Sequence, residues 1–146
     1  MKLTATSEAE LGKVLSHQLN GIMLHFDLAM AYKLMGCKKK SRYHYKQAIE
    51  ETIAHNDTNC IIIEHFHQII KPLQEPRQRI ELNVTYGMAQ AEKDTAHEKA
   101  VQAWLAWEED TADMYEHLCE QMPDCKLWCR LKRASEKEIK HIEDMM

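Results

Sequence analysis

The stretch VQAWLAWEEDTADMYEHLCEQM, residues 101–122, has a large or apolar side chain at every third or fourth position. That period predicts an amphipathic helix with one face turned toward a core. The row that marks this face is Val101, Trp104, Glu108, Thr111, Tyr115, Leu118 and Met122. Glu108 therefore places a carboxylate in a position where packing alone favours Leu. A buried carboxylate costs several kcal/mol unless a metal ion or hydrogen bonds compensate it.

The segment that follows repeats the pattern with two polar residues. Its row is Leu127, Leu131, Ala134, Glu138, His141 and Met145. Glu138 and His141 are three residues apart, so the row puts both on one inward face of a helix. If Pro123 marks the turn, Glu108 lies 15 residues before it and Glu138 lies 15 residues after it. At equal rise per residue the two carboxylates are expected to face each other.

The rest of the chain predicts an all-α protein with a single domain over residues 1–146. Gly (4) and Pro (3) are scarce in 146 residues, whereas good helix formers are abundant. Apparent capping boxes at Ser7 and Thr95 mark two helix starts, and Gly36 marks a helix end. Between the second and third helices, Pro72, Pro76 and Gly87 interrupt the helical pattern. The expected helices span residues 7–36, 42–70, 95–122 and 124–146, with a crossover over 71–93 and Asp124 as the last cap. Two hairpins joined by a long crossover form a four-helix bundle.

Charge and cysteine content narrow the partners and the compartment. The net charge is −4 and the pI is about 6.1, which argues against nucleic acid as a partner. The N-terminus has no apolar signal region, and no stretch is long enough to span a membrane. Five cysteines without a CxxC pair suit a reducing cytoplasm, with Cys125 and Cys129 interpreted as buried free thiols and not as a pair.

The second expected helix carries a weaker polar signal. Glu51 and His55 are one turn apart and border its apolar face, while Thr52, Asn56 and Asn59 lie within that face. Glu51 is equally compatible with a place in the bundle centre and with a solvated position. The solvated position is the usual one for a carboxylate at the border of a helix face.

Three segments resemble the ferritin-like superfamily, which includes ferritins, bacterioferritins and rubrerythrins. They are LSHQLNGIMLHFDLAMAYKLMG, QAIEETIAH and SEKEIKHIEDM. The resemblance implies two antiparallel helix pairs, a long crossover and a di-iron site built from a Glu on helices one and three and a Glu-x-x-His pair on helices two and four.

Carried over residue by residue, the resemblance implies a partial metal site. It assigns His55, Glu108, Glu138 and His141 as ligands, with Glu51 one residue out of register and His25 as a substitute from helix one. Ile22 and Thr52 stand where the family has carboxylates. Three carboxylates leave two iron or manganese ions under-neutralised.

Two functions from different classes follow, and they remain open on the sequence. One is a bundle that binds iron or manganese, with the ligands Glu51, His55, Glu108, Glu138 and His141. This protein is an enzyme only if it retains a weakened ferroxidase or peroxide-consuming activity. The other is a ferritin-like scaffold that has lost the site and acts as a structural or interaction module. Three Trp residues and surplus apolar surface predict core packing and a homo-oligomer that is at least a dimer. An iron-storage shell is a third and weaker hypothesis.

Overall fold

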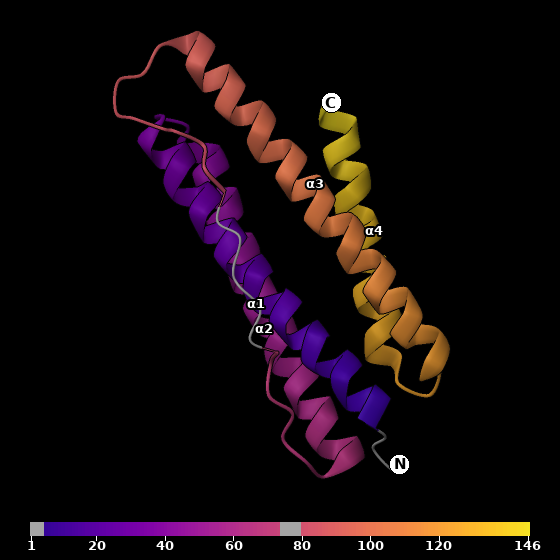
Figure 1. Cartoon of the computed structure of the whole chain (residues 1–146). Helices are drawn as coiled ribbons and strands as arrows, with labels where there is room; N and C mark the ends of the chain where they lie inside the picture. The colour runs from indigo at the N-terminus through magenta and orange to yellow at the C-terminus, as the bar shows by residue number, and fades with distance from the viewer. Residues whose placement is uncertain (1–4, 74–79) are drawn as a thin grey trace. The chain divides into compact units, whose positions relative to one another are not determined.

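The computed structural model describes residues 5–73 and 80–146, and within them it contains four α-helices and no strand (Figure 1). The all-α prediction is confirmed. The helices are α1 (Ala5–Leu34), α2 (Lys38–Phe66), α3 (Gln90–Gln121) and α4 (Lys126–Met145).

The helices fall into two compact units. One unit comprises residues 1–30 and 38–79 and therefore holds most of α1 and all of α2. The other comprises residues 31–37 and 80–146 and holds α3 and α4, which pack against each other. Each unit is thus a helix pair, as the two expected hairpins require.

The connection between α1 and α2 is shorter than the sequence predicts. Gly36 has φ +83°, a left-handed conformation that glycine adopts without the steric cost of a Cβ atom. The Cys37 amide donates to the Tyr32 carbonyl at 2.8 Å, which closes the end of α1. Because this turn is complete at Cys37, α2 begins at Lys38 and not at residue 42.

The caps predicted for the helix starts are wrong, whereas Gly36 does end α1. Ser7 lies inside α1, which begins at Ala5, and Thr95 lies inside α3, five residues after its start. The Thr95 hydroxyl donates to the Ala91 carbonyl at 3.1 Å, so it bonds back within the helix and does not cap it. The N-cap of α4 is Cys125, without a side-chain cap, and not Asp124.

After α2 the chain returns along α1. The Leu73 amide donates to the Gly12 carbonyl at 3.2 Å, and the Ser16 hydroxyl donates to the Leu73 carbonyl. A Cβ atom on Gly12 would lie 3.2 Å from the Lys71 carbonyl oxygen, so this close approach explains the glycine. The predicted non-helical crossover over residues 71–93 is confirmed at residues 71–73 and 80–89, and Pro76 lies outside the described residues. Its bounds are shifted, because α2 ends at Phe66 and not at residue 70, and residues 90–93 already belong to α3.

The core confirms the predicted row on α3 and corrects the one on α4. Trp104, Trp107 and Trp128 are all buried, as expected of apolar anchors. On α4, however, the buried side chains include Trp128, Ser135 and Ile142, which follow one another at intervals of seven residues. Ala134 and His141, which belong to the predicted row, are exposed. The inward face is therefore rotated by about one residue from the predicted row, because burying the Trp128 indole gains more than burying the smaller side chains of that row.

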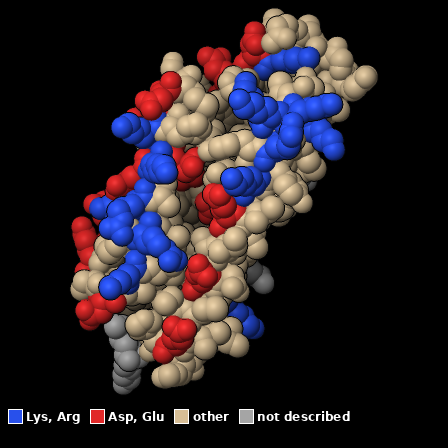
Figure 2. Space-filling model, turned by 180° about the vertical axis from the view of Figure 1, so that it is seen from behind, with Lys and Arg blue, Asp and Glu red and all other residues tan. Residues whose placement is uncertain are grey.

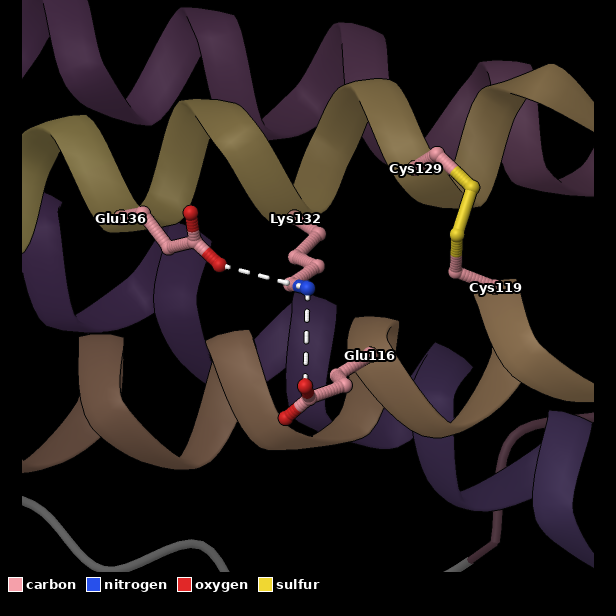
Figure 3. Close-up of a disulfide and its surroundings, with 5 residues drawn as sticks. All are labelled: Glu116, Cys119, Cys129, Lys132 and Glu136. Carbon is pink, nitrogen blue, oxygen red and sulfur yellow. Dashed lines mark hydrogen bonds and ion pairs between the residues drawn. A yellow bond between two sulfur atoms is a disulfide. The ribbon is translucent and has the colours of Figure 1, made fainter.

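The turn between α3 and α4 is closed by a disulfide between Cys119 and Cys129, whose Cα atoms are 5.1 Å apart (Figure 3). The interpretation of Cys129 as a free thiol is therefore wrong, whereas Cys125 is free and buried. Beside the disulfide, the Lys132 ammonium pairs with Glu116 at 3.5 Å and with Glu136 at 3.6 Å.

Loss of this disulfide should destabilise the α3–α4 pair. Its cysteines are separated by 10 residues, and closing a loop of that length lowers the entropy of the unfolded chain enough to contribute about 2–3 kcal/mol. We expect Cys119→Ser to lower the free energy of unfolding by that amount and to abolish the response of the melting temperature to dithiothreitol. Cys60→Ser, which removes an exposed free thiol, is the control and should change neither quantity. An unchanged melting temperature after full reduction of the wild type would contradict a stabilising bond.

Candidate functional site

Glu108 is the buried carboxylate that the sequence predicts. Its side chain is 1% exposed near the middle of α3, in a row whose members from Val101 to Leu118 are all buried. The next member of the row, Thr111, donates from its hydroxyl to the Trp107 carbonyl at 2.6 Å. The helix thus holds one carboxyl group in an otherwise apolar and hydroxyl-bearing face.

The α4 residues that were expected beside Glu108 are less buried. Glu138 is half-buried and His141 is exposed, so the expectation that both turn inward is wrong for His141. Its ring lies edge-on to the Trp104 indole, with centroids 6.2 Å apart. The rotation of α4 that buries Trp128 and Ile142 moves His141 to the border of the helix face.

The predicted residues of α2 lie at the surface or near it. Glu51 and His55 are half-buried, Thr52 and Asn56 are exposed, and Asn59 is half-buried. The apolar face that was predicted to contain these polar residues therefore faces solvent in part. The role of the five predicted ligands stays a prediction: two of them are on the α1–α2 pair and three on the α3–α4 pair.

The α1–α2 pair instead buries a hydrogen-bonded network that the sequence interpretation missed. The Gln18 side chain is 1% exposed, and its amide Nε2 donates to Thr58 Oγ1 at 2.7 Å. Thr58 is fully buried and donates in turn to the Ala54 carbonyl at 2.8 Å. His55 Nδ1 lies 2.9 Å from Gln18 Oε1.

These contacts fix the state of the His55 ring. Because Gln18 Oε1 can only accept, His55 Nδ1 must carry the proton in this bond, which leaves the lone pair on Nε2. Burial lowers the pKa of His55, so the ring is neutral near pH 7. All members of the network are therefore uncharged.

A second buried pair joins the same two helices. His25 and His44 are 0% and 3% exposed, their Nδ1 atoms are 3.0 Å apart, and their rings stack at 5.3 Å. Burial, and then the proximity of His44, lowers the pKa of His25 to about 3. One ring donates and the other accepts, which requires both to be neutral or to share one charge.

A third polar contact lies in the other unit, where the end of α1 meets α3. The Tyr32 hydroxyl is 2.6 Å from His97 Nδ1. Burial, and then the nearby Cys37, raises the pKa of Tyr32 to about 12, so the phenol stays protonated and donates this bond. This bond ties the last turn of α1 to α3.

The described residues do not match the donor set of a di-iron centre. Such a centre takes about four carboxylates. Among residues 5–73 and 80–146, Glu108 is the one buried carboxylate, and no three His, Cys, Asp or Glu side chains come together as a group that could hold a metal ion. Gln18 and Thr58 offer neutral atoms that already bond each other.

No model of a known protein family matches the sequence, and no curated protein matches it. Among solved structures, the chain is similar to bacterioferritin from Rhodobacter capsulatus, described with a metal-free dinuclear site and haem iron. The match has 18% identity and a TM-score of 0.71, and it covers 99% of this chain and 85% of that one. This chain has the ferritin-like fold.

The likeness confirms the predicted all-α, ferritin-like four-helix bundle. It carries over the arrangement of helices and not the chemistry, because fold alone does not determine function. None of the helices, over the residues that the structure describes, is long and apolar enough to cross a membrane.

Proposed function

We propose that this protein uses the ferritin-like fold as a structural or interaction module that self-associates, and that its interior is held by neutral hydrogen bonds and not by a di-iron centre. The observation that carries this proposal is the network of Gln18, His55 and Thr58. It places an amide, a neutral imidazole and a hydroxyl inside the α1–α2 pair and satisfies them with one another.

The charge balance supports the same conclusion. Two divalent ions carry four positive charges, and the predicted ligands include three carboxylates, of which Glu51 and Glu138 are only half-buried. Uncompensated charge in a low-dielectric interior is costly, whereas a completed neutral network is stable without a cation. A ferroxidase or peroxide-consuming reaction that depends on two ions therefore has little support from these side chains.

The buried position of Glu108 favours a second candidate function, the binding of a single divalent ion. When ionised, Glu108 and Glu138 would carry the two negative charges that balance one iron or manganese ion. These carboxylates and His141 do not form a metal-holding group among residues 5–73 and 80–146, so a bound ion would have to draw the three side chains together. A bound ion of this kind supplies Lewis acidity or a redox centre. Haem, which the similar bacterioferritin contains, has no specific support here.

The expected cytoplasmic location rests in part on the cysteines, which were interpreted as free thiols. The disulfide between Cys119 and Cys129 removes the cysteine part of that support, because disulfides persist mainly in oxidising compartments.

Metal content separates the two candidates. We expect protein purified from cells supplied with iron and manganese to hold far less than one ion per chain by plasma mass spectrometry. We also expect it not to accelerate the aerobic oxidation of Fe(II). The variant Glu108→Gln should change neither result, and its matched control is Glu109→Gln on the exposed face of α3. One tightly held ion per chain that is lost in Glu108→Gln and kept in Glu109→Gln would establish the second candidate and overturn the first.

A further inference from the structure

The helix α4 carries a row of positive side chains on the side opposite its buried face. This basic row consists of five exposed residues at intervals of four, three, four and three: Lys126, Arg130, Arg133, Lys137 and Lys140. Such intervals keep side chains on one side of a helix, and Trp128, Ser135 and Ile142 mark the opposite side. In Figure 2, blue side chains follow one another along α4 at the left of the view. The basic row is about 21 Å long at the helical rise per residue, and no Asp or Glu occupies a position within it.

Most charges of the basic row are not neutralised by neighbouring side chains. Lys132, which lies outside the row, pairs with Glu116 at 3.5 Å and with Glu136 at 3.6 Å (Figure 3). In contrast, four members of the row form no ion pair with any residue that the structure describes: Lys126, Arg133, Lys137 and Lys140. Like charges three and four residues apart repel each other and destabilise a helix. An anion that touches several of these cations at once would relieve that repulsion.

The neighbouring helix limits the width of the anion that fits. On α3, an exposed acidic row has the same kind of spacing and consists of Glu109, Asp113, Glu116 and Glu120. Its member Glu116 reaches Lys132, so the acidic row runs beside α4. A wide anionic surface, such as a membrane or a nucleic acid duplex, meets both rows and is repelled by the second one. The basic row therefore selects a narrow anionic segment.

From these observations we infer that the basic row of α4 binds an acidic helical segment of another protein, with Asp or Glu at alternating intervals of three and four residues. Successive cations of the row are about 5 Å apart along the helix axis, and carboxylates at the same intervals on a second helix follow at the same distance. Each cation thus meets a carboxylate when the two helices lie side by side.

Other narrow anions fit the row less well. None of its members is aromatic or aliphatic, so neither the stacking of bases in a single-stranded nucleic acid nor insertion into a bilayer adds to the attraction. The net charge of −4 repels a long polyanion as a whole, whereas a short acidic segment touches only the row. The inference rests on the proposed interaction module, for which it names the class of partner.

An NMR titration with a synthetic peptide tests this surface. The probe is an acetylated, alanine-based peptide of about 16 residues, long enough to match the row, with Glu at alternating intervals of four and three. At low ionic strength we expect it to shift the amide signals of residues 126–140 and to bind with a dissociation constant in the high micromolar range, because exposed ion pairs are individually weak. Raising the salt to about 0.3 M should weaken binding at least fivefold. If signals of residues 126–140 did not move, because the row binds no acidic helix or is covered by a second copy, the inference would be overturned.

Neutral substitutions locate the contact. Arg133→Gln combined with Lys137→Gln removes two exposed charges from the centre of the row, so it should leave the circular dichroism unchanged and raise the dissociation constant about fivefold or more. The matched control, Lys38→Gln combined with Lys39→Gln, changes the net charge equally at exposed positions of α2 and should alter binding less than about twofold. Equal weakening by the two double variants would show an effect of net charge alone and would overturn the inference.

A change in the peptide tests whether the spacing is recognised. A second peptide has the same composition, but its Glu residues are spread around the helix, so fewer of them face the row at once. We expect it to bind at least about threefold more weakly than the first peptide. Equal binding of the two peptides would exclude recognition of a helical row of carboxylates.

Two further probes decide the class of partner. We expect phosphatidylglycerol vesicles and a single-stranded oligonucleotide to bind less tightly than the peptide at an equal concentration of anionic groups. Tighter binding of either probe that is lost in the variant with Arg133→Gln and Lys137→Gln would assign the row to that partner and overturn the acidic helix.

Metal analysis of the same samples distinguishes failure of this inference from failure of the proposed function. Peptide binding by a protein that holds a metal ion contradicts only the neutral interior, whereas a metal-free protein that does not bind the peptide contradicts only the role of the basic row.

Discussion

Gln18→Ala should lower the free energy of unfolding by about 3–4 kcal/mol. The substitution removes a side chain that is 1% exposed, which leaves a cavity between α1 and α2. It also removes the acceptor of the His55 Nδ1 proton and the donor to Thr58 Oγ1. A buried polar group that loses its partner costs about 1–3 kcal/mol, so the two effects add. Chemical denaturation followed by circular dichroism measures the change.

A second substitution at the same position separates the two contributions. Gln18→Met keeps most of the volume and removes the hydrogen bonds, so it should retain part of the loss, about 1–3 kcal/mol. Gln68→Ala, at an exposed position beyond α2, is the control and should have almost no effect. If Gln18→Ala were as stable as the wild type, the network would not hold the α1–α2 pair, and the main support for a neutral interior would be lost.

The predicted row on α3 was accurate because its pattern is long and dominated by bulky side chains. From Val101 to Leu118 every member is buried, and two Trp residues fix which side of the helix turns inward. On α4 the corresponding row ignored Trp128, the largest side chain of that helix. Because Trp128 is buried, α4 is rotated so that His141 is exposed. The three-residue spacing of Glu138 and His141 does not indicate this rotation.

The network around Gln18 was missed although a signal for it exists. Gln18 lies four residues after Val14 and His25 lies three residues before Leu28, in a row that also buries Leu11. The criterion that selects Glu108, a polar residue in a buried apolar row, selects them equally well. Their roles were not predictable, however, because the partners are 40 and 19 positions away on α2. The contact depends on a turn that closes at residue 37, earlier than the sequence suggests.

The helix starts show a different limit. The pattern of a hydroxyl residue followed three positions later by Glu marks a cap only where a helix begins, and the same four residues are stable within a helix. Thr95 illustrates this, because its hydroxyl bonds to the Ala91 carbonyl in the preceding turn. The extra turn of α3 before Thr95 contains Gln90 and Asp94, which bond each other at 2.9 Å and support the helix locally.

The His25–His44 pair should make the protein sensitive to acid well above the pH at which carboxylates titrate. In the folded protein the pKa of His25 is about 3, whereas an unfolded chain has an imidazole pKa near 6.5. Between these values the unfolded chain binds the extra proton, so the free energy of unfolding falls as the pH falls. One group contributes up to about 1.4 kcal/mol per pH unit, or about 5 kcal/mol in all by pH 3.

This contribution is complete above pH 6.5 and is lost progressively below it. Denaturant titrations at half-unit steps from pH 7.5 to pH 4 should therefore show a decline that begins near pH 6.5, before the carboxylates of the surface protonate. His55 acts in the same direction, since burial lowers its pKa too, but its half-buried ring makes a smaller contribution.

Substitution of one ring identifies the source of the decline. His25→Gln retains an amide oxygen that can accept a hydrogen bond from His44 Nδ1, but it has no group that titrates in this range. We expect its stability to be lower at pH 7.5 and to decline much less between pH 6.5 and pH 4. His67→Asn removes an exposed imidazole at a position with φ +53°, which Asn tolerates, and should keep the wild-type pH dependence. If the free energy of unfolding declined equally with pH in the wild type and in His25→Gln, the His25–His44 pair would not be the source of the decline. The proton taken up on unfolding would then bind elsewhere.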